Sequence, residues 1–255
     1  MSAAAKGRLY LVPAPLDFGC DHVAPLQDVM PLATIEVAAQ LQHWICENAK
    51  STRAYLKRVG ELQPLKNQLQ ALQIQELPRE VHKKGDHTGN FDARPLLAAA
   101  LQGKDIGLVS EAGMPAIADP GSSVVRAAHD LGLQVVPLIG PMSLMLALAA
   151  SGLNGQNFAF VGYLPQSPAE RVQRIRELES LALKTGQTQI FIETPYRNAA
   201  VLQALLQTLQ GNTRLALSCG LTLAAAWNFS AQASHWNRNR PVAPLDLPTV
   251  FCIGR

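Results

Sequence analysis

The sequence predicts an α/β protein of two domains, the first with a mostly parallel sheet covered by helices on both faces and the second with a mixed sheet. Short apolar runs alternate with helical patterns in the amino-terminal part, which is typical of parallel sheets. Nearer the carboxyl end, strand patterns follow one another without helices between them. A polar, glycine-containing break at 152–157 separates the two parts, so we expect domains at 1–152 and 153–255.

The elements of the first domain follow from its apolar runs and their spacing. Strands are predicted at residues 8–12, 42–46, 73–77, 105–110 and 133–138, and helices at 24–40, 50–58, 91–102, 121–131 and 141–151. The glutamine-rich segment 63–75 is interpreted as a leucine-faced helix or a connector, with a partner surface as the alternative.

The second domain has the pattern of a mixed sheet. Strands are predicted at 158–163, 188–193, 213–219, 225–231 and 248–254, and a helix is predicted at 196–209. Another helix carries Arg171, Arg174 and Arg176, which we interpret as a solvated face, with phosphate contact as the alternative. The segment from His235 to Arg240 is interpreted as an exposed hairpin, and an RNA-contacting loop is the alternative.

The segment from Asp105 to Gly121 carries the strongest functional signal. A strand runs into a turn of small residues, where a ligand has room to touch the backbone at Ala112 and Gly113. Asp119 and Pro120 are predicted to be the N-cap and first residue of the next helix. The alternative interpretation is an ordinary connection between a strand and a helix.

Two further strands end in similar turns. Residues 139–143 follow the strand at 133–138, and Pro13–Pro15 follow the first strand. Because ligands of parallel sheets sit at the carboxyl ends of strands, these turns predict one shared pocket. Ser143 has an alternative role as the N-cap of its helix.

Composition bounds the class of protein. The chain has 255 residues, 48% of them hydrophobic, which is enough for sizeable cores. The net charge of +3 does not by itself indicate a nucleic-acid binder, and it does not exclude one. The four cysteines form no Cys-x-x-Cys pair, so neither a metal site nor a disulfide framework is expected. Without a signal segment or a membrane-spanning run, the expected location is the cytoplasm.

Five separated motifs resemble the tetrapyrrole methylase superfamily of S-adenosylmethionine-dependent methyltransferases. They are Ser110–Pro115 with Asp119–Gly121, Val136–Ser143, Ser151–Leu153, Phe160–Pro165 and Phe191–Arg197. Their order and spacing most resemble the branch that methylates a cytidine ribose 2′-hydroxyl in 16S ribosomal RNA. The resemblance extends from Leu9 to about Gly254, and it implies a cofactor cleft between two domains.

The resemblance also implies which residues bind S-adenosylmethionine. In the first part of the chain these are Pro13, Ala112, Gly113, Met114, Pro115, Gly140 and Ser143. The adenine side is expected at Glu193, Thr194, Pro195, Gly220, Leu221, Thr222, Pro248, Thr249 and Val250. A homodimer, and ribosomal RNA or the small ribosomal subunit as partner, are implied in the same way.

Three segments depart from the pattern of the ribose-methylating branch. Residues 15–19 replace Pro-Ile-Gly-Asn-Leu, residues 47–50 replace Glu-Asp-Thr-Arg, and residues 219–223 replace Arg-Glu-Leu-Thr-Lys. Because most of the segments implied to bind the cofactor are retained, the resemblance supports cofactor binding more strongly than it supports the reaction.

A ribose hydroxyl is a weak acid and benefits from a general base. Glu47 is the catalytic candidate, with Asp17, Lys50 and Glu111 also placed for the task; each has an alternative capping, surface or positioning role. The alternative functions are methylation of a tetrapyrrole or another small molecule, and cofactor binding without transfer. Against a tetrapyrrole, the chain lacks the Gly-Gly-Asp-Pro form of the central loop.

Overall fold

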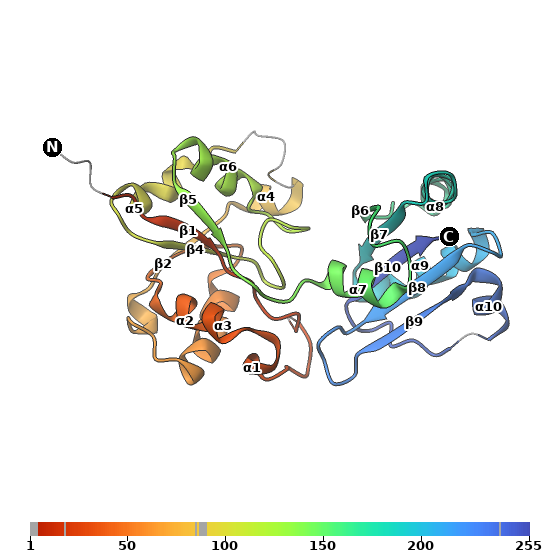
Figure 1. Ribbon diagram of the computed structural model, residues 1–255, viewed down its shortest axis with the longest axis horizontal. Coiled ribbons are helices and arrows are strands. Elements are labelled where there is room, and N and C mark those ends of the chain that lie inside the picture. Colours follow the sequence, from red (N-terminus) through yellow and green to blue (C-terminus); the bar gives the residue numbers. More distant parts are fainter. Residues whose placement is uncertain (1–4, 18, 85, 87–90, 240) are drawn as a thin grey trace. The chain divides into compact units, whose positions relative to one another are not determined.

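The computed structural model describes residues 5–17, 19–84, 86, 91–239 and 241–255, which form two compact units (Figure 1). The first unit comprises Met1–Gly19 and Val23–Pro141, and the second comprises Cys20–His22 and Met142–Arg255. The main boundary therefore lies at Pro141, not after residue 152 as expected. The reason is the helix α7 (Ser143–Ser151), which packs on the sheet of the second unit.

The first unit contains a five-stranded parallel sheet in the order β3-β2-β4-β1-β5. Its strands are β1 (Arg8–Leu11), β2 (His43–Cys46), β3 (Gln73–Glu76), β4 (Ile106–Val109) and β5 (Gln134–Pro137). All five predicted strands are confirmed, each with slightly shorter bounds.

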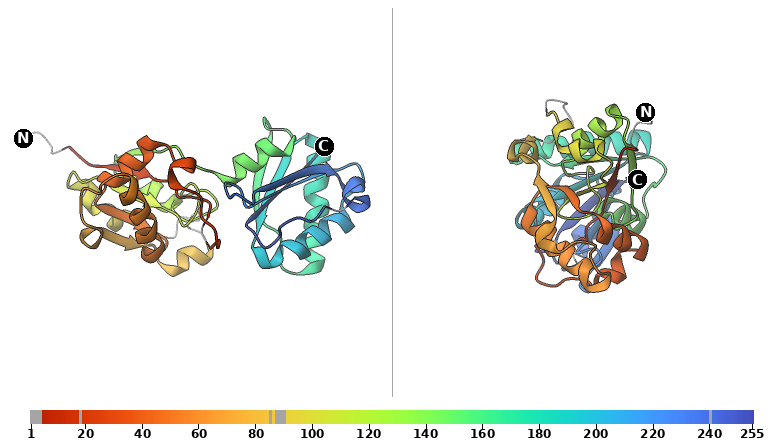
Figure 2. Two further views of the ribbon diagram at one scale, coloured as in Figure 1. Left: turned by 90° about the horizontal axis from the view of Figure 1, so that it is seen from below. Right: turned by 90° about the vertical axis from the view of Figure 1, so that its left-hand side faces the viewer.

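Helices cover both faces of this sheet, as Figures 1 and 2 show. They are α1 (Leu26–Val29), α2 (Leu32–Gln40), α3 (Ala49–Leu62), α4 (Arg79–Lys84), α5 (Ala98–Leu101) and α6 (Ser122–Asp130), with 3-10 turns η1 (Leu69–Ala71) and η2 (Arg94–Leu97). The predicted helix 24–40 is two helices because Pro31 precedes α2, and α4 was not predicted. Segment 63–75 is a connector that contains η1 and leads into β3.

Alternation along the strands divides the core of the first unit into two layers. Tyr10 and Trp44 face α2 and α3, whereas Leu9 and Ile45 face α5, α6 and η2. Gly107 leaves room for the buried indole, because a Cβ atom there would lie 2.6 Å from the Trp44 ring. Helices therefore pack on both faces of the central strands, and the ends of the strands are where such sheets bind ligands.

The second unit contains a mixed sheet in the order β6-β7-β10-β8-β9. Its strands are β6 (Phe158–Tyr163), β7 (Thr188–Glu193), β8 (Arg214–Cys219), β9 (Trp227–Gln232) and β10 (Thr249–Gly254). Only β6 and β7 pair in parallel, and the other neighbours are antiparallel. The predicted mixed sheet is thus confirmed.

Helices also cover both faces of the second sheet (Figure 2). One face packs against α8 (Pro168–Thr185), α9 (Pro195–Thr208) and α10 (Ala233–Arg238), and the other packs against α7. The hairpin predicted at 235–240 is wrong where the structure describes it: α10 ends at Arg238 and buries Trp236 fully in the core, and Arg240 lies outside the described residues. No helix in the described part of the chain is long and apolar enough to cross a membrane.

Candidate functional site

The carboxyl ends of β4, β1 and β5 lie side by side, so the three small-residue turns leave the same edge of the first sheet. Strands β1 and β4 are neighbours in this sheet. The connection from β1 leads past β4 to β2, whereas the connection from β4 through α6 leads past β1 to β5, in the opposite direction along the sheet. The edge between β1 and β4 is therefore the topological switch point, where open α/β sheets bind ligands. This arrangement confirms that the turns share one edge.

The turns after β1 and β4 are joined by their backbones. The Ala14 amide donates to the Gly113 carbonyl and the Gly113 amide donates to the Ala14 carbonyl, both at 2.9 Å. Gly113 has a φ of +71°, a conformation that favours glycine, and a Cβ atom there would lie 3.3 Å from Leu16 Cδ2. Because its amide already has a partner, Gly113 shapes the turn and does not offer that N–H to a cofactor.

Gly140 is required by a close approach of the turns after β1 and β5. A Cβ atom on Gly140 would lie 2.5 Å from the ring of Pro13. The Thr34 hydroxyl donates to the Ile139 carbonyl at 2.7 Å and fixes the turn from the side of α2. Pro13 and Gly140, both expected from the resemblance to bind the cofactor, thus lie against one another.

The loop after Gly113 has a strained backbone, and hydrogen bonds to a residue distant in the sequence hold its end in place. Ala116 and Ala118 both have a φ of 66°, which costs about 1–3 kcal/mol for a residue with a Cβ atom. The buried Asp86 carboxylate accepts hydrogen bonds from the amides of Gly121 and Ser123, at 2.9 Å each, at the start of α6. The predicted N-cap, Asp119, is therefore wrong: the cap position is Gly121, and a distant side chain supplies the acceptor.

Three carboxylates gather between the ends of β2 and β4. Glu47 Oε1 accepts a hydrogen bond from the Glu111 amide at 3.3 Å, and the Ser51 hydroxyl donates to Glu111. Burial, together with the negative charges of Glu47 and Glu111, raises the pKa of Asp119 to about 7. Asp119, which the sequence suggested as a helix cap, thus belongs to this carboxylate group.

The other candidate bases have different surroundings. The Asp17 carboxylate is buried and forms an ion pair with Arg58, whose Nη2 lies 3.1 Å from Oδ2. Lys50 is exposed, and its amide donates to the Asn48 side chain, which caps α3. Asp17 is therefore a structural partner of α3, and Phe18 beside it lies outside the described residues.

In the second unit, the three segments expected on the adenine side meet at one end of the sheet. Thr249 in β10 pairs with Glu193 in β7 and with Cys219 in β8. The Gly220 amide donates to the Pro248 carbonyl at 2.9 Å, which links two of the segments directly. The strand register thus brings together residues that are far apart in the sequence.

This end of the second sheet is tightly built. A Cβ atom on Gly220 would lie 2.7 Å from Leu247, and Thr222 has a φ of 72°. Asn198 donates to the carbonyls of Leu245 and Leu247 and so fixes the approach to β10. The Thr222 hydroxyl is buried without a hydrogen-bond partner among the described residues. Such a combination of backbone strain and an unpaired polar atom is typical of a binding site.

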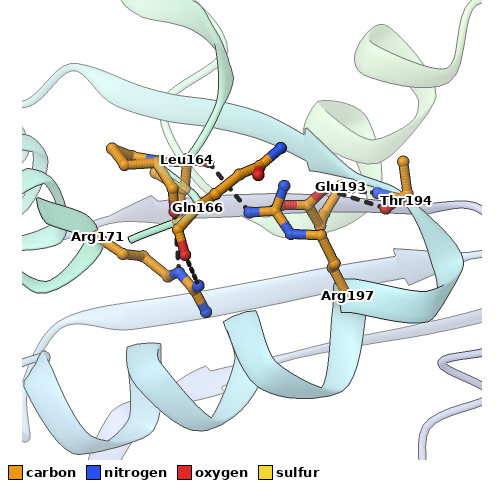
Figure 3. Close-up of polar contacts among 7 residues, drawn as sticks. Leu164, Gln166, Arg171, Glu193, Thr194 and Arg197 are labelled. Carbon is orange, nitrogen blue, oxygen red and sulfur yellow. Dashed lines mark hydrogen bonds and ion pairs between the residues drawn. The ribbon is translucent and has the colours of Figure 1, made fainter. Parts of the chain in front are cut away.

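Glu193 is engaged within the protein, as Figure 3 shows. Its carboxylate accepts a hydrogen bond from the Thr194 amide at 2.8 Å and lies 3.0 Å from Arg197 Nη2. Arg197 also donates to the Leu164 carbonyl. Glu193 therefore positions the start of α9.

Arg171 lies at the start of α8, and its interpretation as part of a solvated helix face is wrong. The side chain is buried and donates to the carbonyls of Pro165 and Gln166 (Figure 3). It thereby fixes the loop between β6 and α8. Ser143 is the first residue of α7, and its alternative role as N-cap is also wrong, because that position is Met142.

Comparison with known proteins shows which protein family the sequence matches. The family described as Tetrapyrrole (Corrin/Porphyrin) Methylases matches residues 29–226. This range includes the turn after β4, the turn after β5 and the segment 220–222.

Similar proteins carry a common name, ribosomal RNA small subunit methyltransferase I. The chain is 33% identical to the one from Mesorhizobium japonicum over 96% of its own length and 74% of that protein. It is 30% identical to the one from Escherichia coli O157:H7, over 86% of the chain and 66% of that protein. With the one from Vibrio cholerae it shares 39% identity over 54% of the chain and 46% of that protein. Part of each relative therefore lies outside the matched region.

A solved structure shares the fold. The uroporphyrin-III-C-methyltransferase from Thermus thermophilus aligns with a TM-score of 0.52 and 17% identity, over 98% of this chain and 94% of that one. At this identity the likeness concerns the fold alone.

Proposed function

The chain belongs to the tetrapyrrole methylase family of methyltransferases, and from this premise we propose that it transfers a methyl group from S-adenosylmethionine to a ribose 2′-hydroxyl in small-subunit ribosomal RNA. The observation that carries the proposal is the 33% sequence identity, over 96% of the chain, with a protein named ribosomal RNA small subunit methyltransferase I.

We propose that each of the two units binds part of this cofactor. In the first unit, Gly113 and Gly140 allow the turns after β1, β4 and β5 to pack closely together at the end of the sheet, which supports the proposal. In the second, the Thr222 hydroxyl, which has no partner among the described residues, and the tight Gly220 turn offer a polar edge to a heterocycle. When bound, S-adenosylmethionine supplies an electrophilic methyl group and leaves as a neutral thioether.

The residues of the first unit must orient the acceptor and take its proton. As the 2′-oxygen bonds to the methyl carbon, the carbon–sulfur bond breaks with its electron pair going to sulfur, and the hydroxyl proton needs an acceptor. We propose Asp119 as that acceptor, because it lies in the loop that follows β4, near Glu47 and Glu111, and burial and these neighbouring charges raise its pKa to about 7. Glu47, the candidate expected from the sequence, then acts through its charge on Asp119.

The test is transfer of labelled methyl groups to small ribosomal subunits that lack this modification. We expect label in the RNA, located by nuclease mapping to a 2′-O-methylated nucleotide that resists alkaline cleavage. Calorimetry with S-adenosylhomocysteine on the same preparation measures cofactor binding separately.

The outcomes separate the alternatives. Binding without transfer to the subunit would overturn the proposed function and favour a cofactor-binding protein or a small-molecule methyltransferase. Label on a base instead of a ribose would overturn only the ribose assignment.

A further inference from the structure

A small cavity opens at the topological switch point of the first sheet. Its volume is about 250 Å³, and it lies between the ends of β1 and β4 and one face of α3. Its walls are formed by Ala14, Pro15, Asp17, Val23, Ser51, Thr52, Ala54, Tyr55, Arg58, Val109, Ser110 and Glu111. All of these residues belong to the first unit.

The walls are mostly apolar with a few fixed polar groups, the usual chemistry of a small-molecule site. Ala14, Pro15 and Val109 are buried and present apolar surface. The Arg58 guanidinium is held in place by Asp17 and by the Ala24 carbonyl, to which it donates at 2.7 Å. The cavity is therefore shaped before any ligand arrives.

Two residues that line the cavity, Tyr55 and Ser110, carry hydroxyl groups with unused hydrogen-bonding capacity. The Tyr55 and Ser110 hydroxyls are buried and have no hydrogen-bond partner among the described residues. Buried polar groups in folded proteins nearly always have a partner, so each exception requires an explanation. A ligand with polar edges would provide one.

Two neighbours connect the cavity to the site already described. Ala14 also pairs with Gly113 in the turn after β4, and Glu111 also belongs to the carboxylate group around Asp119. A ligand in the cavity therefore lies beside the residues proposed to take the acceptor proton.

We propose that this cavity receives the base of the acceptor nucleotide, turned out of the RNA, with the Tyr55 and Ser110 hydroxyls as partners for its polar edge. The inference rests on the proposed function and names the part of the substrate that this pocket recognises. Proteins that recognise single-stranded RNA commonly splay out a base and bind its edges. The volume lies below the roughly 300–1,000 Å³ of pockets for drug-sized ligands, so a single planar ring suits it better than a tetrapyrrole.

The first test fills the mouth of the cavity. Ala54 lines the cavity and is exposed on α3, so Ala54→Phe should fold and obstruct entry. Ala98→Phe is the matched control, because Ala98 is an exposed helical alanine of the same unit outside the cavity. We expect KM for the small subunit to rise at least tenfold in Ala54→Phe alone, with cofactor affinity within twofold of the wild type in both variants.

The second test removes the unpaired hydroxyls. Tyr55→Phe and Ser110→Ala should each raise KM for the subunit several-fold while leaving the melting temperature unchanged or higher, because neither hydroxyl has a partner among the described residues. A merely structural role would change the melting temperature and leave KM alone.

The results also separate this inference from the proposed function. If the wild type methylates the subunit and Ala54→Phe behaves as Ala98→Phe does, the pocket assignment is overturned and the function stands. If the wild type methylates no small subunit, both proposals are overturned.

Discussion

At the scale of single residues, the pKa of Asp119 is the property most open to experiment. Burial raises it first, and the charges of Glu47 and Glu111 raise it further, to about 7. A base must be ionised to accept a proton, so we expect kcat/KM to rise as the pH passes through about 7. Asp119→Asn should lower transfer by at least a hundredfold, within the range typical of general-base removal.

The substitution Glu47→Gln tests whether Asp119 or Glu47 is the general base. Removing the negative charge of Glu47 should lower the pKa of Asp119, so the rise in kcat/KM should move to lower pH while the plateau is retained. Glu36→Gln is the control, since Glu36 is an exposed residue of α2 and has no part in this group. A loss of transfer at every pH in Glu47→Gln would instead make Glu47 the base.

At the scale of elements, the start of α6 depends on Asp86. Burial works to raise the pKa of Asp86, but hydrogen bonds from Ser123, Ser122 and the Gly121 amide together outweigh it, and the pKa is lowered. The stabilisation from this carboxylate is therefore present above its unfolded pKa and is lost as the pH falls through the folded one. Asp86→Ala should reduce the free energy of unfolding by about 2 kcal/mol at neutral pH.

Urea unfolding at pH 7 and at pH 3 measures this contribution. Asp92→Ala is the control, because Asp92 is an exposed partner of Arg94 and exposed ion pairs contribute little to stability. The cap assignment would be wrong if the two substitutions had equal effects at pH 7, or if the effect of Asp86→Ala were independent of pH.

The turn after β4 offers a second test at this scale. Gly113→Ala and Gly132→Ala both place a Cβ atom on a residue with positive φ, at +71° and +63°. Both should therefore lose a similar free energy of unfolding, about 1–3 kcal/mol. Only Gly113→Ala alters the turn joined to Ala14, so we expect at least tenfold weaker binding of S-adenosylhomocysteine in that variant alone, measured by calorimetry.

Periodicity and turn residues were sufficient to predict the strands of both units, because most of the strands are short apolar or alternating runs bounded by polar residues or glycine. They also predicted that the turns after β1, β4 and β5 share an edge. The contacts that complete the edge could not be predicted in the same way. Asp86 and Arg58 act on residues 35 and 41 positions away, and no local pattern marks such pairs.

The domain boundary was predicted at the wrong position for a related reason. The break at 152–157 is a real loop, but the chain had already passed to the second unit before α7. The apolar sequence of α7 indicates burial without indicating against which sheet. Tertiary packing decides that, through contacts of α7 with β8, β9 and β10.

At the scale of the whole molecule, the expected dimer stays a prediction. The apolar character of α7 was one reason to expect it, and packing of Leu144, Ala147 and Leu148 into the core of the second unit accounts for part of that character, whereas Leu146 is exposed. The expectation otherwise rests on the resemblance. Light scattering at micromolar concentration should give twice the mass of the 27.5 kDa chain, and the monomer mass would contradict the prediction.

The charge of the whole chain bears on how RNA is recognised. A net charge of +3 over 255 residues gives weak nonspecific attraction to phosphates, so shape and base contacts must supply most of the selectivity. We therefore expect assembled small subunits to be much better substrates than short oligonucleotides with the same acceptor sequence. We also expect log KM for subunits to depend only weakly on log salt, with a slope corresponding to a few phosphate contacts. Transfer assays on both substrates from about 50 to 200 mM salt measure these quantities. Efficient methylation of the short oligonucleotide would show that local sequence suffices, and a steep salt dependence would show that phosphate contacts dominate despite the small net charge.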